Sequence, residues 1–420
     1  MTVNLTTLPN GFRIVSEFMP GLQSAAIGVW VLAGARHEAA DQNGIAHFLE
    51  HMAFKGTRTR NALQIAEAIE DVGGYINAYT SREVTAYYAR VLADDVPLAL
   101  DVVADILRNP VFDDREIEVE RGVILQEIGQ TLDTPDDIIF DWLQEKAYPD
   151  HPLGRTILGA EERVRAFSRN DLLRFVDQRY RPGQMILSAS GAVDHDALVR
   201  MAEGLFGDMA TSETLAPPAA RFSGGESRTV KPLEQAHFAL AFESPDYTDP
   251  DIHAAQIYAT ALGGSMSSRL FQEVRERRGL CYTIYAQAGA YSDTGMMTIY
   301  AGTSADEMPG LARITVDEMK RAADDLSEAE LERARAQMKA GLLMGLESPS
   351  NRAERQARMI QIWGRVPALD EVVERIDAVT LADLRQLAAR VATEAPAAMA
   401  LYGPVEAAPT LEALQERRAA

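Results

Sequence analysis

The sequence predicts an α+β protein built from two similar domains. Its 420 residues are long for one domain and sufficient for two. The stretch 215–231 contains a Pro-Pro pair and a Gly-Gly pair, lacks apolar periodicity and divides the chain into halves of similar length. The expected elements also follow the same order in both halves. We therefore expect an N-terminal domain at 1–214, a linker at 215–231 and a C-terminal domain at 232–420.

The first half opens with an expected strand at 25–33, where Ile27, Val29 and Val31 alternate along the chain. Apolar residues at every second position are typical of a strand. The other elements expected in this half are helices at 44–55 and 62–72, strands at 75–80 and 83–92, a run of helices from 95 to about 148, and a strand at 185–192 after a further helix.

The second half repeats this order. It predicts a strand at 236–243, helices at 252–262 and 269–277, strands at 282–290 and 296–303, long helices from 307 to about 363, and a short strand at 397–402. Two segments with the same succession of elements indicate a weak internal repeat of two α+β units.

Composition narrows the class of protein. A formal net charge of −21 argues against nucleic-acid binding, which requires a basic surface. We find no apolar run long enough to span a bilayer, and residues 1–20 lack the basic and apolar segments of a signal peptide. No membrane partner and a cytoplasmic location are therefore expected. The single cysteine, Cys281, excludes an intrachain disulfide and fits a small buried residue.

The histidines point to a metal site. Of the seven, only His47 and His51 have the spacing of metal ligands. Residues four apart lie on one face of a helix, so both imidazoles can reach one Zn²⁺ at about 2.0–2.1 Å. Glu50 projects from the same side of that helix, next to the metal. The alternative is a helix with two exposed histidines and no metal.

A catalytic zinc usually has three protein ligands and an open position. The stretch 116–127 is helical in pattern, and Glu120 and Glu127 are seven residues apart on one face. We expect this face to be the one that also carries Val123, Ile124 and Ile128. An inward carboxylate is costly unless it is paired or bound to metal. This helix is therefore nominated to supply the third ligand.

The motif His47-Phe48-Leu49-Glu50-His51 is an inverted zincin motif. With it, the chain resembles the pitrilysin family (M16) of metallopeptidases along essentially its whole length. The resemblance is closest to the short-chain branch, which contains the mitochondrial processing peptidase β-subunit and bacterial relatives. That family has its third ligand, a glutamate, some 76 residues after the second histidine. Here the spacing lands on Glu127 (127 − 51 = 76), and the family's supporting glutamate matches Glu120.

Three further segments match the family. Residues 74–81, with Asn77, Ala78, Tyr79 and Thr80, resemble its substrate-binding edge strand, and 267–275 resemble the signature of its second domain. Arg275 and Tyr282 match an Arg and Tyr pair used at the family's active site. The resemblance implies a LuxS/M16-like metalloenzyme fold, in which each domain is a mostly antiparallel sheet flanked by helices. It also implies one Zn²⁺ per chain.

The implied activity is a zinc endopeptidase that cleaves extended peptides or unfolded segments. Glu50 would be the general base, Glu120 would orient a ligand, and Tyr282 would donate a hydrogen bond to the oxyanion. Asp137 and Asp141 are four apart on an expected helix. In the processing peptidases, acidic residues of this region recognise an arginine near the cut. The alternative for these two aspartates is a solvated charged face.

The resemblance also implies an assembly. Long-chain relatives enclose the substrate between two halves, and this chain supplies one half. We therefore expect a homodimer with composite active sites. Two other functions remain open at this point. Family members that lost the metal serve as non-catalytic partner or scaffold subunits, but here every expected ligand is present. A structural metal protein would need a fourth protein ligand, and none has suitable spacing.

Overall fold

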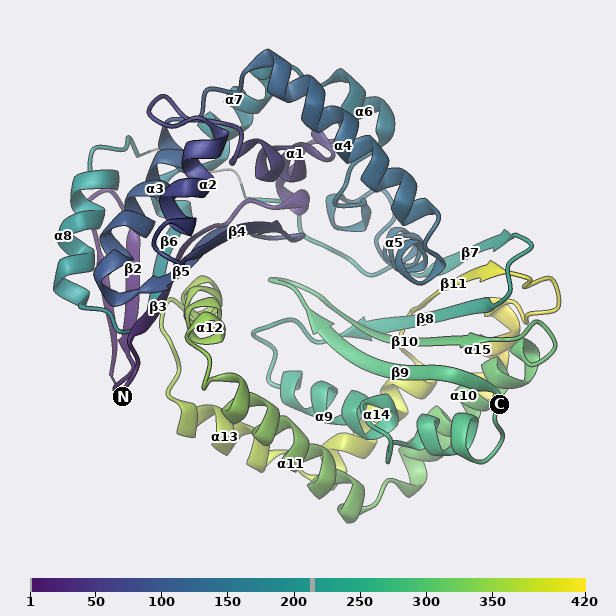
Figure 1. Cartoon of the computed structure of the whole chain (residues 1–420). Helices are drawn as coiled ribbons and strands as arrows, with labels where there is room; N and C mark the ends of the chain where they lie inside the picture. Colours follow the sequence, from purple (N-terminus) through teal and green to yellow (C-terminus); the bar gives the residue numbers. More distant parts are fainter. Residues whose placement is uncertain (1, 212–215) are drawn as a thin grey trace. The chain divides into compact units, whose positions relative to one another are not determined.

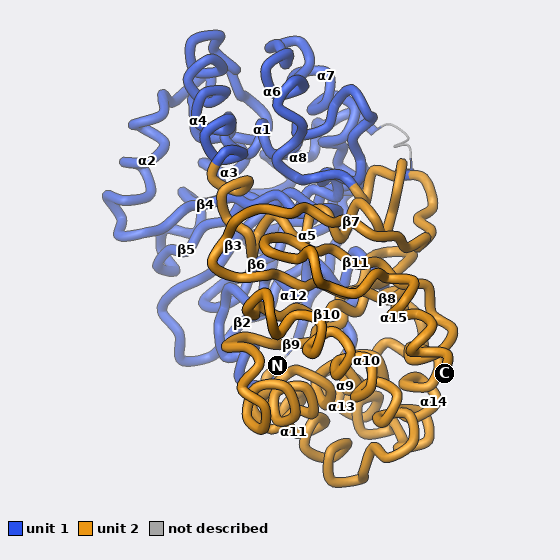
Figure 2. Tube along the Cα trace, turned by 90° about the vertical axis from the view of Figure 1, so that its right-hand side faces the viewer, with its two compact units in different colours: residues 1–129, 155–217, 343–367 blue, residues 130–154, 218–342, 368–420 orange. Residues whose placement is uncertain are grey.

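A computed structural model describes residues 2–211 and 216–420 (Figure 1). The expected boundary between N-terminal domain and linker, at 214 and 215, lies outside the described residues. No helix in the described ranges is both long enough and apolar enough to cross a membrane. The chain divides into two compact units, and each is described below by itself. Unit 1 comprises 1–129, 155–217 and 343–367, and unit 2 comprises 130–154, 218–342 and 368–420 (Figure 2).

Unit 1 contains a sheet in the order β1-β2-β6-β3-β5-β4. Only the pairing of β2 with β6 is parallel, and the other neighbours are antiparallel. The central strand β3 is apolar and buried from Ala25 onward, which fixes it in the middle of the sheet. The bounds of the strands are β1 Val3–Thr7, β2 Arg13–Phe18, β3 Ser24–Val31, β4 Tyr75–Thr80, β5 Thr85–Leu92 and β6 Met185–Gly191.

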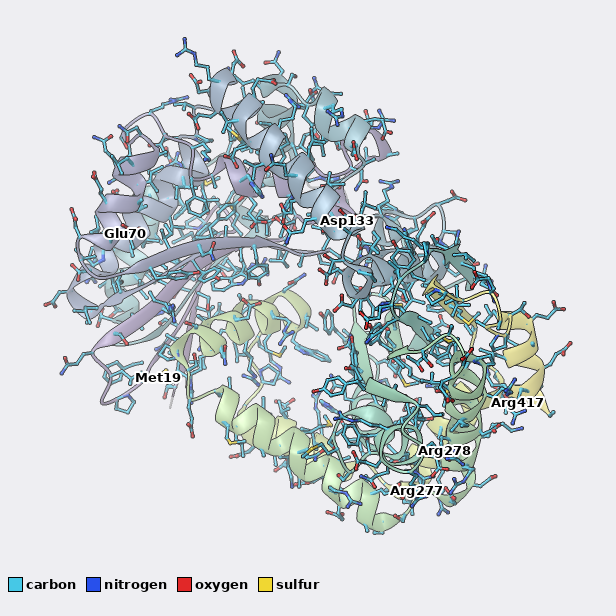
Figure 3. All side chains as sticks on the ribbon, turned by 45° about the vertical axis from the view of Figure 1, so that its right-hand side comes forward. Met19, Glu70, Asp133, Arg277, Arg278 and Arg417 are labelled. Atoms are coloured by element: carbon cyan, nitrogen blue, oxygen red, sulfur yellow. The ribbon has the colours of Figure 1, made fainter. Side chains whose placement is uncertain are left out.

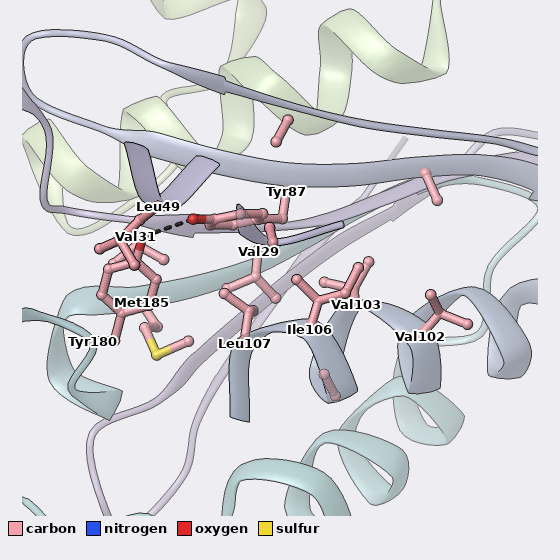
Figure 4. Close-up of a cluster of buried hydrophobic side chains, with 14 of the residues drawn as sticks. Val29, Val31, Leu49, Tyr87, Val102, Val103, Ile106, Leu107, Tyr180 and Met185 are labelled. Carbon is pink, nitrogen blue, oxygen red and sulfur yellow. Dashed lines mark hydrogen bonds between the residues drawn. The ribbon is translucent and has the colours of Figure 1, made fainter. Parts of the chain in front are cut away.

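Helices cover both faces of this sheet. On one face, the apolar sides of α1, α3 and α8 close the main core of the unit, part of which Figure 4 shows. On the other face, α12 packs against β2, β3 and β6 through Ala353, Ala357 and Ile360. The helices that lie wholly in unit 1 are α1 Ile45–Met52, α2 Ala62–Glu70, α3 Val96–Arg108, α6 Glu161–Ala166, α7 Arg169–Arg179, α8 His195–Phe206 and α12 Pro349–Trp363.

Unit 2 has a sheet in the order β7-β11-β8-β10-β9, with β7 and β11 parallel and the other pairs antiparallel. Its strands are β7 Gly225–Val230, β8 Ala236–Ser244, β9 Cys281–Ala290, β10 Gly295–Thr303 and β11 Ala397–Gly403. One face packs against α5, and the other against a helical layer that includes α9, α10 and α14. The helices that lie wholly in unit 2 are α5 Pro135–Ala147, α9 Ile252–Gly263, α10 Met308–Asp325, α13 Leu369–Ala378, α14 Leu381–Thr393 and α15 Leu411–Ala419.

The two sheets share one topology. Without the edge strand β1, the order β2-β6-β3-β5-β4 corresponds strand for strand to β7-β11-β8-β10-β9, including the single parallel pair. The expected fold class, two similar α+β units with mostly antiparallel sheets flanked by helices, is therefore confirmed.

The repeat includes an exchange of helices. In each half of the sequence, three helices follow an antiparallel pair of strands. After β4 and β5 come α3, α4 (Asp114–Leu132) and α5, and after β9 and β10 come α10, α11 (Glu328–Gly345) and α12. The third helix of each set covers the sheet of the other unit, so α4 and α11 each begin in one unit and end in the other. The compact units are thus not the two sequence halves. The domain limits expected from sequence concern those halves and stay a prediction.

Several elements differ from expectation, and helices α8, α13, α14 and α15 are among those not anticipated. β1, β2 and β7 were not anticipated, and β7 occupies part of the segment expected to be a linker. The expected helix at 269–277 is a π-helical turn, Phe271–Glu276. Arg277 and Arg278, labelled in Figure 3, follow this turn and both pair with Glu273.

Candidate metal centre

Helix α1 carries His47, Glu50 and His51 and is anchored by its apolar side. Ile45, Phe48, Leu49 and Met52 are buried in the core of unit 1. Gly44, just before the helix, has φ +97°, a conformation that favours glycine. A Cβ at Gly44 would come within 2.7 Å of the Gly159 Cα, so the close approach of these two loops also requires glycine.

The buried Glu38 holds the N-terminus of this helix. Its Oε1 accepts a hydrogen bond from the Ala46 N–H (2.9 Å), and its Oε2 accepts from the Gly44 N–H (2.9 Å) and from Asn43 Nδ2 (3.2 Å). A carboxylate at this end of a helix satisfies free N–H groups and faces the positive end of the helix dipole. Glu38 therefore fixes the start of the helix that bears both histidines.

Helix α4 brings Glu127 to these histidines. Glu127 Oε2 lies 3.6 Å from His47 Nε2 and 3.4 Å from His51 Nε2. One ligand atom from each of the three residues lies within 4.8 Å of the other two. Ligands placed tetrahedrally at 2.0–2.1 Å from a zinc ion are about 3.3–3.4 Å apart. The two distances to Glu127 thus fit a shared zinc ion better than direct hydrogen bonds.

The lack of a hydrogen-bond partner for a buried oxygen of this group also fits a metal site. Glu127 Oε2 is buried and has no hydrogen-bond partner of good geometry among the described residues. A buried carboxylate oxygen without a partner is costly, and a cation between it and two imidazoles removes that cost. In the described part of the chain, the group consists of these three ligands. Two histidines and a glutamate with a free fourth position are typical of a catalytic zinc site.

Charge at the histidines is set by burial and by the nearby carboxylates. Burial, together with the charge of His51, lowers the pKa of His47 to about 4, so this imidazole is neutral and ready to bind metal. For His51, burial lowers the pKa, but Glu127 and Glu120 more than offset it, and the net shift is upward. Because a metal binds the neutral imidazole, a proton on His51 competes with the metal.

Glu120 lies one helical heptad before Glu127 and is buried. Its Oε2 is 2.9 Å from His51 Nδ1, and its Oε1 is 2.6 Å from the Lys55 Nζ. The inward face of α4 consists of Ile117, Glu120, Ile124 and Ile128. The expectation that Val123 shares this face is wrong, because its side chain is 42% exposed. At about 100° per residue, Ile117, Ile124 and Ile128 lie to one side of Glu120 around the helix and Val123 lies to the other, roughly 100° from the centre of the buried face.

Glu50 is half-buried beside the group. Burial raises the pKa of its carboxyl, while hydrogen bonds from the side chain and backbone of Thr80 and the charge of His51 oppose this rise. The hydroxyls of Tyr87 and Tyr180 lie 2.7 Å apart in the core (Figure 4). Burial, together with the charge of Glu50, raises the pKa of both hydroxyls. A carboxyl with a raised pKa, next to a metal site, is suited to accept a proton and return it.

Strand β4 contains the four expected substrate-binding residues, Asn77 to Thr80. It pairs with β5 and ends the sheet, so its outer edge has no partner strand in the described part of the chain. Ala78 joins the core on the side of α1, whereas Tyr79 faces α12 and donates a hydrogen bond to Glu354 Oε1 (2.6 Å). Asn77 is exposed and donates a hydrogen bond to the Tyr75 hydroxyl (2.6 Å).

The remaining expected site residues lie in unit 2. The Arg275 guanidinium stacks on two rings, 4.6 Å from the centre of Phe271 and 4.8 Å from that of Tyr282. Tyr282 itself is 78% exposed. Asp137 is exposed and Asp141 half-buried, both on α5. The structure thus brings His47, Glu50, Thr80, Glu120 and Glu127 together with His51 in unit 1, and Arg275 with Tyr282 in unit 2.

Sequence reasoning missed two residues that flank α1, the helix of the two histidines. Lys55 follows His51 by four residues, and this helical spacing could have placed it on the same face. Glu38 gives no such signal, since it precedes the helix by a loop whose path the sequence does not reveal.

Comparison with known proteins places this geometry in a family. Residues 13–161 match the family model described as Insulinase (Peptidase family M16), and residues 166–338 match that of the Peptidase M16 inactive domain. A protein from Rickettsia bellii, named as an uncharacterized zinc protease, is 39% identical over 402 residues, 96% of this chain and 97% of its own. The similarly named YmxG of Bacillus subtilis is 39% identical over 95% of this chain and 97% of its own.

Solved structures share the fold. A protease from Helicobacter pylori superposes with a TM-score of 0.88 at 21% identity, covering 96% of this chain and 99% of that one. A chain of complex III2 from Candida albicans superposes with a TM-score of 0.89 at 22% identity, covering 99% and 100%. Since family models match both halves, and relatives align over nearly the full length, this chain belongs to Peptidase family M16.

Proposed function

We propose that this protein is a zinc-dependent endopeptidase that cleaves extended peptides or unfolded segments. The observation that carries the proposal is the group of His47, His51 and Glu127, with Glu50 beside it and a free fourth position. The names of the curated relatives, which are called zinc proteases, support the same activity. We propose one Zn²⁺ per chain.

The chain's residues divide the work of hydrolysis. His47, His51 and Glu127 would hold a zinc ion, which would supply a bound water with a pKa lowered toward about 7 and a Lewis acid for the peptide carbonyl. Glu50 takes the proton of the attacking water and passes it to the leaving amine, a role worth about 10²–10⁴-fold in rate. Glu120 holds His51 through Nδ1, which leaves Nε2 free for the metal.

The substrate is proposed to bind as an added strand. The outer edge of β4, from Asn77 to Thr80, has no partner strand among the described residues, and main-chain hydrogen bonds along such an edge are independent of the peptide sequence. Thr80 also lowers the pKa of Glu50, so the bound strand would run past the base. This arrangement favours extended chains over folded ones. Arg275 and Tyr282 are proposed to complete the site from the second copy of a homodimer.

A peptide-library digest with Glu50→Gln as the matched variant tests this function. The wild type with zinc should cleave many peptides, a chelator should abolish cleavage, and zinc should restore it. Glu50→Gln should keep zinc but lose at least about 100-fold in turnover, because a carboxamide does not accept the proton. Glu70→Gln, an exposed carboxyl on α2 labelled in Figure 3, should behave as wild type.

The same digest separates the second candidate, a non-catalytic partner subunit of the family. That function predicts no zinc-dependent cleavage by the wild type, whether alone or with zinc added. The complete ligand set with its adjacent base favours the enzyme, since a purely structural partner has no need for an open metal position.

A further inference from the structure

Lys55 shares one face with the two histidines of the metal helix. It follows His51 by four residues, as His51 follows His47, and its backbone N–H still bonds to the Met52 carbonyl just beyond the end of α1. Its Nζ lies 2.6 Å from Glu120 Oε1, and its side chain is 29% exposed. The ammonium group therefore reaches from the metal helix back to α4.

Glu120 is divided between two partners. Oε1 pairs with the Lys55 ammonium, and Oε2 lies 2.9 Å from His51 Nδ1. The Glu120 side chain itself is only 6% exposed. A buried carboxylate is costly without polar partners, and Lys55 and His51 are the side chains in contact with this one. These two contacts connect Lys55 through Glu120 to His51.

The contact between Glu120 and His51 determines which nitrogen of His51 can bind a metal. A ring N–H of a metal-binding histidine that donates to a carboxylate fixes the tautomer and the direction of the ring. For His51, that donor is Nδ1, so Nε2 is the nitrogen that faces Glu127 at 3.4 Å. A Glu120 that turned away would no longer hold the ring in this state.

We propose that Lys55 is a positioning residue of the metal centre, which holds the Glu120 carboxylate in the orientation that makes His51 present Nε2 to the metal. This inference rests on the proposed zinc site at His47, His51 and Glu127. It gives a role to a side chain that itself does not reach the ligand atoms, and it predicts that metal affinity, not only folding, depends on Lys55.

A second ion pair of unit 1 provides a matched control. Arg60 Nη1 lies 2.9 Å from Asp105 Oδ2, with side-chain exposures of 22% and 6%, close to the 29% and 6% of Lys55 and Glu120. Thr57 and Thr59 are the hydroxyl donors to the same Asp105 oxygen, so that pair holds a loop and not a metal ligand. Arg60 also pairs with Asp101 (2.5 Å), so Arg60→Met reports what the loss of at least one comparable pair does to the fold alone.

The test measures zinc dissociation constants by competition with a chromophoric chelator. Wild type, Lys55→Met, Lys55→Gln, Lys55→Arg and Arg60→Met are compared, with melting temperatures as a second readout. Lys55→Met and Lys55→Gln should weaken zinc binding by about 10–100-fold. Lys55→Arg, which keeps the cation, should recover most of this loss. Arg60→Met should lower the melting temperature but leave the zinc affinity within about twofold.

A double-mutant cycle tests whether Lys55 acts through Glu120. In a Glu120→Gln background, Lys55→Met should change zinc affinity by no more than about twofold, since the residue it positions is already gone. Equal zinc affinity of wild type, Lys55→Met and Lys55→Gln would overturn the role of Lys55 while leaving the metal site intact. Additive losses would mean that Lys55 acts by another path. A wild type that binds no zinc would overturn the proposed site itself.

Discussion

The side chain and backbone of Thr80 lower the pKa of the Glu50 carboxyl, and the Thr80 hydroxyl donates to the Ala46 carbonyl on the same helix as Glu50 (3.4 Å). Thr80 ends β4, the free edge of the sheet in unit 1, so one residue belongs to the proposed substrate strand and also contacts the proposed base. Hydrogen bonds to a carboxylate stabilise its charged form. The position of the edge strand therefore helps to set the protonation of Glu50.

Thr80→Val should shift the acid limb of the pH profile of kcat/KM to higher pH. The Thr80 side chain lowers the pKa of Glu50, so its loss lets burial raise that pKa further. Because the base works in its ionised form, activity is then lost at a higher pH on acidification, while the neutral plateau is kept. Thr80→Ser should retain the wild-type limb. Coincident limbs for the valine variant and the wild type would contradict this link.

Glu38 should make stability depend on pH. Burial raises its pKa to about 8 from 4.5, although hydrogen bonds from Ala46, Gly44 and Asn43 and the charge of Arg155 oppose the rise. The folded pKa exceeds the unfolded one, so this contribution is complete below about pH 4.5 and is lost as the pH rises through about 8. Glu38→Gln should remove that slope.

The measurement for Glu38 compares melting temperatures of the metal-free proteins across about pH 5–9. Wild type should lose stability relative to Glu38→Gln as the pH rises, and the exposed Glu70→Gln should follow the wild type. At low pH, Glu38→Gln should be the less stable by about 1–3 kcal/mol, since an amide NH₂ replaces an acceptor that faces N–H donors. Parallel profiles at all pH values would be the contrary result.

The Tyr87 and Tyr180 pair should contribute to the stability of unit 1. Their hydroxyls are 2.7 Å apart among fully buried apolar side chains. Tyr180→Phe leaves the Tyr87 hydroxyl without this partner and should cost about 1–3 kcal/mol in the free energy of unfolding, as measured in urea. Tyr87→Phe combined with Tyr180→Phe should cost less than the two single changes added together. Strict additivity would argue against an energetic link between the two hydroxyls.

The sequence predicts the central strands and the metal helix well because their signals are local. Ile27, Val29 and Val31 alternate along β3, and two histidines four apart need only a helix to meet. The position of Glu120 on the inner face of α4 also follows from its spacing to Ile124 and Ile128. That Glu127 is the third ligand came from the family resemblance, since Glu120 and Glu127 are equivalent in local pattern.

The elements that the sequence conceals depend on distant partners. β2 buries Ser16 and Glu17, polar residues that interrupt an apolar strand pattern. Ser16 bonds to His195 (2.8 Å), and Glu17 pairs with Arg352 (2.5 Å), more than 300 residues away. β7 is an edge strand without apolar alternation. The exchange of α5 and α12 is likewise tertiary, because an amphipathic helix does not specify which of two similar sheets its apolar face will cover.

The acidic face of α5 should confer a preference for basic peptides. Asp137 and Asp141 are one helical turn apart, and Asp137 is exposed. Changing both to Asn should lower kcat/KM for peptides with Arg near the scissile bond by several-fold, about the effect of two exposed charge pairs, and should spare Arg-free peptides. Asp133→Asn, an exposed acid labelled in Figure 3, controls for net charge. The difference should shrink with salt, and equal losses for both peptide classes would count against the idea.

The last prediction concerns the assembly. Tyr282 is 78% exposed, and the guanidinium of Arg275 lies over its ring, so an aromatic hydroxyl is held ready on the surface of unit 2. We propose a homodimer in which each zinc site receives Arg275 and Tyr282 from the other copy. Two-fold dimers are the commonest protein oligomers, and their symmetry would complete both sites at once.

Complementation between two inactive variants tests this arrangement. Glu50→Gln and Tyr282→Phe should each be weak alone. After subunit exchange of an equal mixture, about half of the dimers are mixed, and each has one site that pairs an intact Glu50 with the partner's Tyr282. About a quarter of all sites should then regain wild-type turnover. If Tyr282 acts within its own chain, no mixed dimer contains a complete site, and the mixture stays inactive. A fully active monomer in sedimentation would reject the dimer directly, because the proposed site is incomplete in one copy.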